Sequence, residues 1–128
     1  MNYLYEDKPL GTIGALKQLE EYFSKSIILT NCDIIIETNY NDLLLHHKEH
    51  TNDITIVASL KHFNIPYGVC EIENGGQLLS INEKPEYDLL VNTGMYVLEP
   101  KVLKHIPKNK FFHITDLIDK IKSTHKIG

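Results

Sequence analysis

A short apolar run with a helical pattern before it gives the first indication of the fold. Residues 26–30 read Ser-Ile-Ile-Leu-Thr, and residues 13–23 carry apolar side chains at the spacing of one helical face. A continuously apolar strand is typical of the buried centre of a parallel sheet that helices cover on both faces. Asn31, Cys32 and Asp33 follow at its carboxyl end, where open α/β sheets bind ligands. We therefore predict a mixed α/β layer structure.

The rest of the chain continues the alternation of helical and β-rich segments. Gly75 and Gly76 separate two extended runs and permit the positive φ of a tight hairpin turn. His113 or Thr115 is a candidate N-cap for the last helix, with Asp116 near its positive end. Helices are predicted over residues 13–23, 41–50, 102–106 and 115–123, and strands over residues 26–30, 54–60, 67–73, 77–82 and 89–98.

The composition is that of one ordinary globular domain. Of 128 residues, 42% are apolar and 23% are charged, which fits a single core. We expect no membrane partner and a cytoplasmic location, because no apolar run reaches the roughly 18 residues of a bilayer span and no secretory signal is recognisable. The net charge is −4 and all thirteen basic residues are lysines. The absence of arginine argues against a nucleic-acid partner.

The cysteines and histidines do not form a metal-binding motif. Cys32 and Cys70 each stand alone, so we expect reduced, buried side chains and neither a disulfide nor a zinc site. His46, His47 and His50 are close in sequence, and the outer two lie one helical turn apart. A zinc site needs three or four ligands, and no H-E-x-x-H pattern is present. We expect a solvated polar helix face here.

A charged turn precedes the last predicted strand. Glu83, Lys84 and Pro85 are followed seven residues later by Asn92. A carboxylate accepts hydrogen bonds from sugar hydroxyls, and a lysine ammonium supplies a compact positive charge for a phosphate. The pair suits a phosphorylated sugar. The alternative is a solvated ion pair in a loop, which is common on protein surfaces and contributes little.

Five short motifs occur along the chain in one order. They are residues 9–16 (PLGTIGAL), 26–33 (SIILTNCD), 66–69 (PYGV), 83–85 (EKP) and 92–94 (NTG). Together they resemble the sugar-phosphate nucleotidyltransferase family, and the resemblance runs through nearly the whole chain. It implies transfer of a nucleotidyl group from a nucleoside triphosphate to a sugar 1-phosphate, with release of pyrophosphate. It also implies a Rossmann-like mixed, mainly parallel sheet flanked by helices, with a β-hairpin insertion.

The resemblance assigns roles to the charged residues. Asp33 would be a catalytic residue and a ligand of Mg²⁺, which favours a few carboxylates together with phosphate oxygens and water. The alternative for this side chain is a strand-end aspartate that caps a turn. Cys32 stands where the family commonly has glycine, which would narrow the nucleotide side of the pocket. Lys84 would be catalytic through its contact with the sugar phosphate, and Glu83 would bind sugar hydroxyls.

Further substrate contacts would come from the backbone and from small side chains. Leu10, Gly11 and Thr12 would present backbone groups and a hydroxyl to the nucleotide base, although Thr12 also fits the N-cap of the helix that follows. Gly68 would let the sugar lie against the backbone, unless it marks only a β-bulge. The resemblance implies three more substrate-binding residues, namely Asn31, Thr93 and Gly94.

Two parts of the family's domain have no counterpart in the chain. One is the G-x-G-T-R-L loop that holds the triphosphate, and the other is a W-x-D-I-G-like segment with a second metal ligand. We therefore expect residues 1–128 to be one incomplete nucleotidyltransferase domain, weak or inactive as an enzyme alone. Its strand edges would favour a homo-oligomer. The alternative is a non-catalytic sugar-phosphate-binding or structural module.

Overall fold

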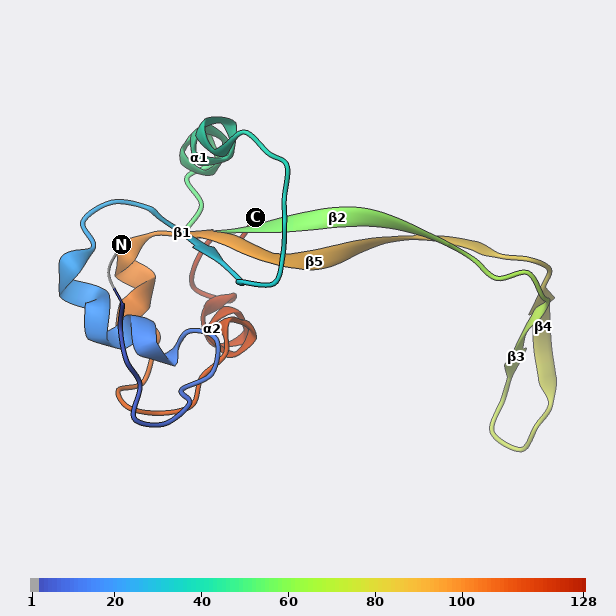
Figure 1. Cartoon of the computed structure of the whole chain (residues 1–128). Helices are drawn as coiled ribbons and strands as arrows, with labels where there is room; N and C mark the ends of the chain where they lie inside the picture. Colours follow the sequence, from blue (N-terminus) through green and yellow to red (C-terminus); the bar gives the residue numbers. More distant parts are fainter. Residues whose placement is uncertain (1–2) are drawn as a thin grey trace. The chain divides into compact units, whose positions relative to one another are not determined.

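The computed structural model describes residues 3–128 and has a mixed α/β architecture (Figure 1). Two compact units are present: the described residues up to Val57 together with Gly94–Gly128, and Ala58–Thr93. Two 3₁₀ helices among the described residues are marked η. The elements are η1 (Gly14–Tyr22), β1 (Ile27–Thr30), α1 (Tyr40–Glu49), β2 (Ile54–Asn64), β3 (Val69–Ile72), β4 (Leu78–Asn82), β5 (Glu86–Leu98), η2 (Pro100–His105) and α2 (Ile114–Ile121).

The strands form a three-stranded sheet in the order β1-β5-β2 and a separate β3-β4 hairpin. β1 and β5 are antiparallel, with Ile27 opposite Leu98 and Thr30 opposite Met95. This differs from the mainly parallel sheet that we predicted. The apolar run of residues 26–30 indicated that both faces of this strand would be covered. Such a pattern does not determine whether the neighbouring strand runs parallel or antiparallel. An isolated parallel β-bridge joins Ile54 and Ile127.

Helices cover both faces of the sheet in the first unit (Figure 1). α1 lies on one face, and η1, η2 and α2 lie on the other. The end of β5 is accordingly buried without alternation from Met95 to Leu98. The core cluster consists of Ile13, Ile54, Tyr96, Leu98, Val102, Leu103, Ile106, Ile114, Leu117 and Ile121.

α2 shows how local sequence places a helix on this core. Ile114, Leu117 and Ile121 recur at helical spacing and are buried. His113 is the N-cap of α2, which was one of the two predicted candidates. Its backbone N–H donates to Asp116 Oδ2 at 2.8 Å. The cap satisfies a backbone donor at the helix start, so the helix begins where its apolar face reaches the core.

The second unit consists of parts of β2 and β5 and the β3-β4 hairpin, and few of its residues are buried. Val69 pairs with Asn82 in the β3-β4 hairpin, and Gly75 and Gly76 in its turn have φ of 107° and 88°, so the predicted hairpin is confirmed. Many large apolar side chains are exposed because no second layer lies over them among the described residues. They are Leu60, Phe63, Tyr67, Ile72, Leu78, Leu79, Ile81, Tyr87, Leu89, Leu90 and Val91.

Two further expectations differ from the structure. Cys32 and Cys70 are both exposed and not buried as predicted, because one lies in the turn after β1 and the other in the uncovered hairpin. His47 is buried and does not belong to a solvated helix face, whereas His46 and His50 are exposed as expected. In the part of the chain that the structure describes, no helix has the length and apolar character needed to cross a bilayer.

Candidate functional site

Asn31 and Gly94 meet at the end of β1. The Asn31 backbone N–H donates to the Gly94 carbonyl at 3.0 Å. Gly94 is buried and has a φ of 84°, and a Cβ on it would lie 2.6 Å from the Asn31 side-chain nitrogen. Glycine is therefore required here both by the backbone and by the space that Asn31 fills. Two of the predicted substrate-binding residues are thus in contact.

Asp33 lies in the turn two residues further on, with an exposed carboxylate. Within residues 3–128 this carboxylate has no hydrogen-bond or ion-pair partner, so no turn cap is formed. The described residues also contain no group of three His, Cys, Asp or Glu side chains that could hold a metal. A single free carboxylate fits Mg²⁺, which takes one or two protein carboxylates and completes its shell with water and substrate phosphates.

The predicted nucleotide loop packs against the segment that leads into α2. The Phe112 N–H donates to the Leu10 carbonyl at 2.9 Å, and a Cβ on Gly11 would lie 2.6 Å from the Phe112 oxygen. The Thr12 hydroxyl accepts from the Ile114 N–H at 3.0 Å. Thr12 therefore satisfies the start of α2, and η1 has Ile13 at its N-cap position without a side-chain cap.

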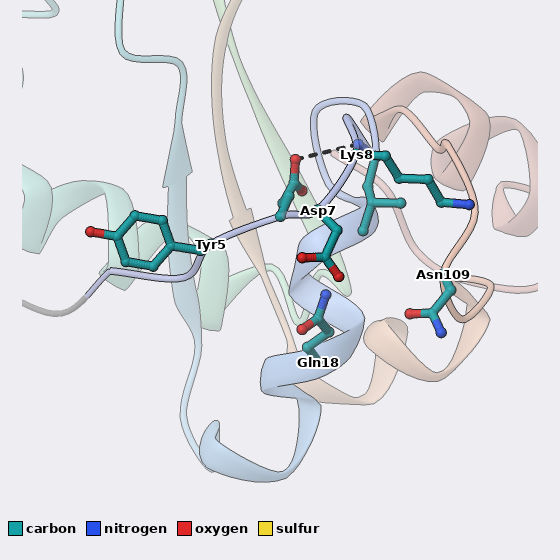
Figure 2. A pocket seen from close by; sticks show the side chains of 7 residues that line it. Tyr5, Asp7, Lys8, Gln18 and Asn109 are labelled. Carbon is teal, nitrogen blue, oxygen red and sulfur yellow. Dashed lines mark hydrogen bonds between the residues drawn. The ribbon is translucent and has the colours of Figure 1, made fainter.

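A polar pocket lies beside this loop (Figure 2). A Glu6 oxygen accepts from the Leu10 N–H at 3.3 Å, drawn as the dashed line. The carboxylate of Asp7 and the amide of Gln18 point toward one another across the pocket. Carboxylates and amides can pair with the donors and acceptors on the edge of a nucleobase. The lining residues are Tyr5, Glu6, Asp7, Lys8, Leu10, Gln18 and Asn109.

The second unit brings together Gly68 and Glu83. A Cβ on Gly68 would lie 3.0 Å from a Glu83 carboxylate oxygen, so the glycine leaves room for this side chain. Lys84 follows with an exposed side chain and a positive φ of 46°, which non-glycine residues adopt infrequently. Pro85 behind them is buried, and its carbonyl accepts from the Ile65 N–H at 3.1 Å. The charged turn is therefore anchored on its carboxyl side.

The predicted site residues thus form two groups. Asn31, Asp33 and Gly94 belong to the first unit, and Glu83 and Lys84 belong to the second. Thr93 lies half-buried in β5 next to this boundary. Whether Asp33 and Lys84 act on the same substrate stays a prediction.

A buried polar network around His47 was missed by the sequence reasoning. His47 Nδ1 lies 2.7 Å from Thr55 Oγ1, and His47 Nε2 lies 3.1 Å from Glu99 Oε1. The Ser26 hydroxyl donates to the same Glu99 oxygen at 2.6 Å, and the Asn52 amide donates to Thr55 Oγ1 at 3.1 Å. These bonds connect α1 with the ends of all three sheet strands.

The helical pattern did contain a signal for this network. Leu43 and Leu44 lie four and three residues before His47, so each shares a helix face with it, and His47 on that face reaches Thr55 of the sheet. His46 and His50 are on the solvent side, where their rings stack with centroids 4.0 Å apart. A histidine within an apolar helical face therefore indicated a buried hydrogen-bonded side chain.

Two groups in the first unit have clearly shifted pKa values. Burial alone would raise the pKa of Asp53, but hydrogen bonds from Lys101 and the Lys126 backbone outweigh it and hold the pKa below 3.8. Burial, then His125 and nearby lysines, lowers the pKa of His105 below 6.5. His105 Nε2 is buried without a hydrogen-bond partner in the described residues, so a proton there would have no acceptor.

Comparison with known proteins identifies one family. The family model for nucleotidyl transferase matches residues 1–126. The chain is 32% identical over 111 residues to the mannose-1-phosphate guanylyltransferase catalytic subunit beta of Dictyostelium discoideum, covering 83% of this chain and 31% of that protein. It is 27% identical over 124 residues to the UTP–glucose-1-phosphate uridylyltransferase of a Synechocystis species, covering 89% of this chain and 32% of that protein.

A solved structure supports the fold. HddC from Yersinia pseudotuberculosis superposes with a TM-score of 0.63 at 27% identity, covering 95% of this chain and 53% of that one. The chain therefore spans about a third of the length of the curated relatives it matches, and about half of this solved chain.

Proposed function

Because the chain belongs to the nucleotidyl transferase family, we propose that the domain it forms part of transfers a nucleotidyl group to a sugar 1-phosphate. The observation that carries the proposal is the family match over residues 1–126, which includes the predicted site residues of both units. The free Asp33 carboxylate and the Glu83 carboxylate beside Gly68 support it, since each is exposed and available to a ligand.

In the proposed reaction, an oxygen of the sugar phosphate attacks the α-phosphorus of the nucleotide. A new P–O bond forms in line with the bond that breaks, and pyrophosphate leaves. Little acid-base chemistry is needed, so positioning and positive charge do most of the work. Lys84 would hold the sugar phosphate, Glu83 would accept hydrogen bonds from sugar hydroxyls, and Asp33 would hold Mg²⁺. Mg²⁺ bound there would supply charge neutralisation at the phosphates.

We propose that the loop of Leu10, Gly11 and Thr12 in the first unit binds the nucleotide. Leu10 lines the polar pocket of Figure 2, whose amides and carboxylates can pair with a base edge. Gly11 and Thr12 would contribute from the same loop, and Asn31, Thr93 and Gly94 from the β1 and β5 segments. GTP and mannose 1-phosphate are the substrates to test first, since a relative at 32% identity is named a mannose-1-phosphate guanylyltransferase.

The proposal is tested by pyrophosphate release with GTP or UTP, mannose or glucose 1-phosphate, and Mg²⁺. We expect slow or no turnover by the chain alone, because interactions made mainly in the transition state are worth several kcal/mol each. Robust turnover would show that the residues of this chain suffice for catalysis and would contradict the expected weak activity. Binding is the more direct test. Isothermal titration of mannose 1-phosphate into the chain should detect binding that Lys84→Ala weakens.

Lys61→Ala is the matched control for that titration, because Lys61 is also an exposed lysine of the second unit. Removal of one charge-assisted phosphate contact should weaken binding by roughly tenfold or more in Lys84→Ala and leave Lys61→Ala near wild type. Equal effects of the two substitutions would show that only the net charge affects binding. Lys84 would then not be a specific ligand of the phosphate.

A non-catalytic sugar-phosphate-binding module is the second candidate, because the exposed Glu83 and Lys84 side chains could bind a phosphorylated sugar without catalysing its reaction. In that case sugar-phosphate binding would persist although extended assays with Mg²⁺ and triphosphates give no pyrophosphate. We also propose a cytoplasmic location and self-association. β1 is at the edge of its sheet, and an exposed edge strand can pair with another chain. Sedimentation at several concentrations tests the association.

A further inference from the structure

A second cavity lies in the first unit, at the other end of β1 from Asp33. Its volume is about 520 Å³, within the range of roughly 300–1,000 Å³ typical of small-molecule sites. It includes no residue that sequence analysis assigned to a substrate. We call it the Glu99 pocket. Its lining residues are Ser24, Lys25, Ser26, Leu44, Lys48 and Glu99.

Glu99 is held in place by the buried network beneath this pocket. Its Oε1 atom lies 2.6 Å from the Ser26 hydroxyl and 3.1 Å from His47 Nε2. His47 is 1% exposed and is fixed from its other side by Thr55, so the imidazole cannot swing away. Both contacts use Oε1, and Oε2 has no partner within residues 3–128. The Glu99 side chain is 32% exposed, which leaves this second oxygen available to a ligand.

The pocket also carries two lysines without carboxylate partners in the described part of the chain. Lys25 and Lys48 are both exposed and lie on either side of β1 in sequence. By contrast, the Lys101 ammonium lies 2.5 Å from Asp53, and the Lys17 ammonium lies 2.6 Å from Glu20. The lysines of the Glu99 pocket are therefore free to bind an anion, whereas Lys101 and Lys17 each already pair with a carboxylate.

A carboxylate that accepts from hydroxyls and lysines that bind a phosphate are the groups that recognise a phosphorylated sugar. The hydroxyl of Ser24 adds a donor, and Leu44 adds an apolar surface against which a sugar ring can lie. We propose that the Glu99 pocket is a second binding site for a phosphorylated sugar, with Lys25 and Lys48 on the phosphate and Glu99 on the hydroxyls. This site is separate from the one proposed at Lys84.

The test uses a chain in which the Lys84 site has been removed. Mannose 1-phosphate is titrated into Lys84→Ala, into Lys84→Ala/Lys48→Ala, and into Lys84→Ala/Lys122→Ala. Lys122 is the matched control, because it is an exposed lysine in the first unit that pairs with Asp119 outside the pocket. Amide shifts in nuclear magnetic resonance spectra report the place of binding, and circular dichroism confirms that each variant is folded.

We expect Lys84→Ala to keep one binding event, with shifts centred on residues 24–26 and 48. Adding Lys48→Ala should weaken it by roughly tenfold or more, as for loss of a charge-assisted hydrogen bond, and adding Lys122→Ala should not. Inorganic phosphate should bind the same site more weakly. Equal affinity for phosphate and mannose 1-phosphate would overturn the assignment to a sugar.

The two proposals fail in different ways. If Lys84→Ala abolishes all binding, the Glu99 pocket is not a site and the role of Lys84 stands. If Lys84→Ala binds as wild type does and Lys84→Ala/Lys48→Ala does not bind, the Glu99 pocket stands and Lys84 is not a sugar-phosphate ligand.

Discussion

Gly94 is subject to two separate constraints. Its φ of 84° costs any other residue backbone strain, roughly 1–2 kcal/mol for a left-handed conformation. A Cβ would in addition lie 2.6 Å from the Asn31 side chain. We expect Gly94→Ala to lower the free energy of unfolding by the strain plus roughly 1–3 kcal/mol of overpacking. Urea unfolding followed by circular dichroism measures this loss.

Gly76→Ala is the control for the strain alone. Its φ of 88° is nearly the same, and nothing lies within 4 Å of the Cβ position. If both variants lose equal stability, the contact with Asn31 does not constrain Gly94.

His105 should make the stability of the chain depend on pH. The lowered pKa of His105 means that the unfolded chain takes up this proton first as the pH falls. The contribution of the neutral His105 side chain to the free energy of unfolding is therefore fully present above about pH 6.5. It is lost as the pH falls through the lowered pKa of His105. Urea midpoints between pH 5 and pH 8 should show this decline, and His105→Phe should reduce it.

His46→Gln serves as the control for that titration, because His46 is an exposed histidine. A pH profile unchanged by His105→Phe would show that other groups cause the decline.

At the scale of elements, α2 depends on a residue about a hundred positions away. The Thr12 hydroxyl accepts from the Ile114 N–H, and His113 and Asp116 satisfy the neighbouring donors. We expect Thr12→Ala to cost about 1 kcal/mol of stability, the usual effect of losing a helix cap. Thr12→Ser keeps the oxygen and should retain most of the stability. Thermal unfolding compares the two, and an equal loss in both would show that the methyl group matters and the cap does not.

α1 is attached to the sheet by polar contacts as well as apolar ones. His47 reaches both Thr55 at the start of β2 and Glu99 just after β5. Breaking a buried network of this kind leaves unsatisfied groups, which is more costly than the net value of the bonds. The network therefore fixes the orientation of α1 on the sheet. It also fixes the position of the Glu99 carboxylate in the Glu99 pocket.

At the scale of the whole molecule, the two units differ in how much they bury. Met95–Leu98 are buried in the first unit, whereas Leu89, Leu90 and Val91 in the same strand are exposed. Amides of residues 58–93 should therefore exchange with solvent deuterium much faster than those of residues 95–98, because local opening there exposes little new apolar surface. Hydrogen exchange read by mass spectrometry tests this. Equal protection along β5 would contradict it and would indicate that the second unit is covered in solution.

Much of the architecture was predictable from local patterns. The β3-β4 hairpin followed from Gly75 and Gly76, and the position of α2 followed from its apolar spacing and the His113 cap. Strand direction was not predictable, since the apolar run of β1 is compatible with either direction. The exposure of Cys32 and Cys70 was also not predictable, because it depends on which layers lie over a segment.

The amino-acid sequence by itself determined the family, the order of the elements and the residue types that suit a phosphorylated sugar, because periodicity, turn residues and short motifs are local properties. Tertiary structure alone decided that Asn31 fills the space beside Gly94, that Thr12 caps α2, and that His47 fixes Glu99. Each of these contacts joins residues distant in the chain. Their proximity follows from the packing of the sheet and helices, which no single segment encodes.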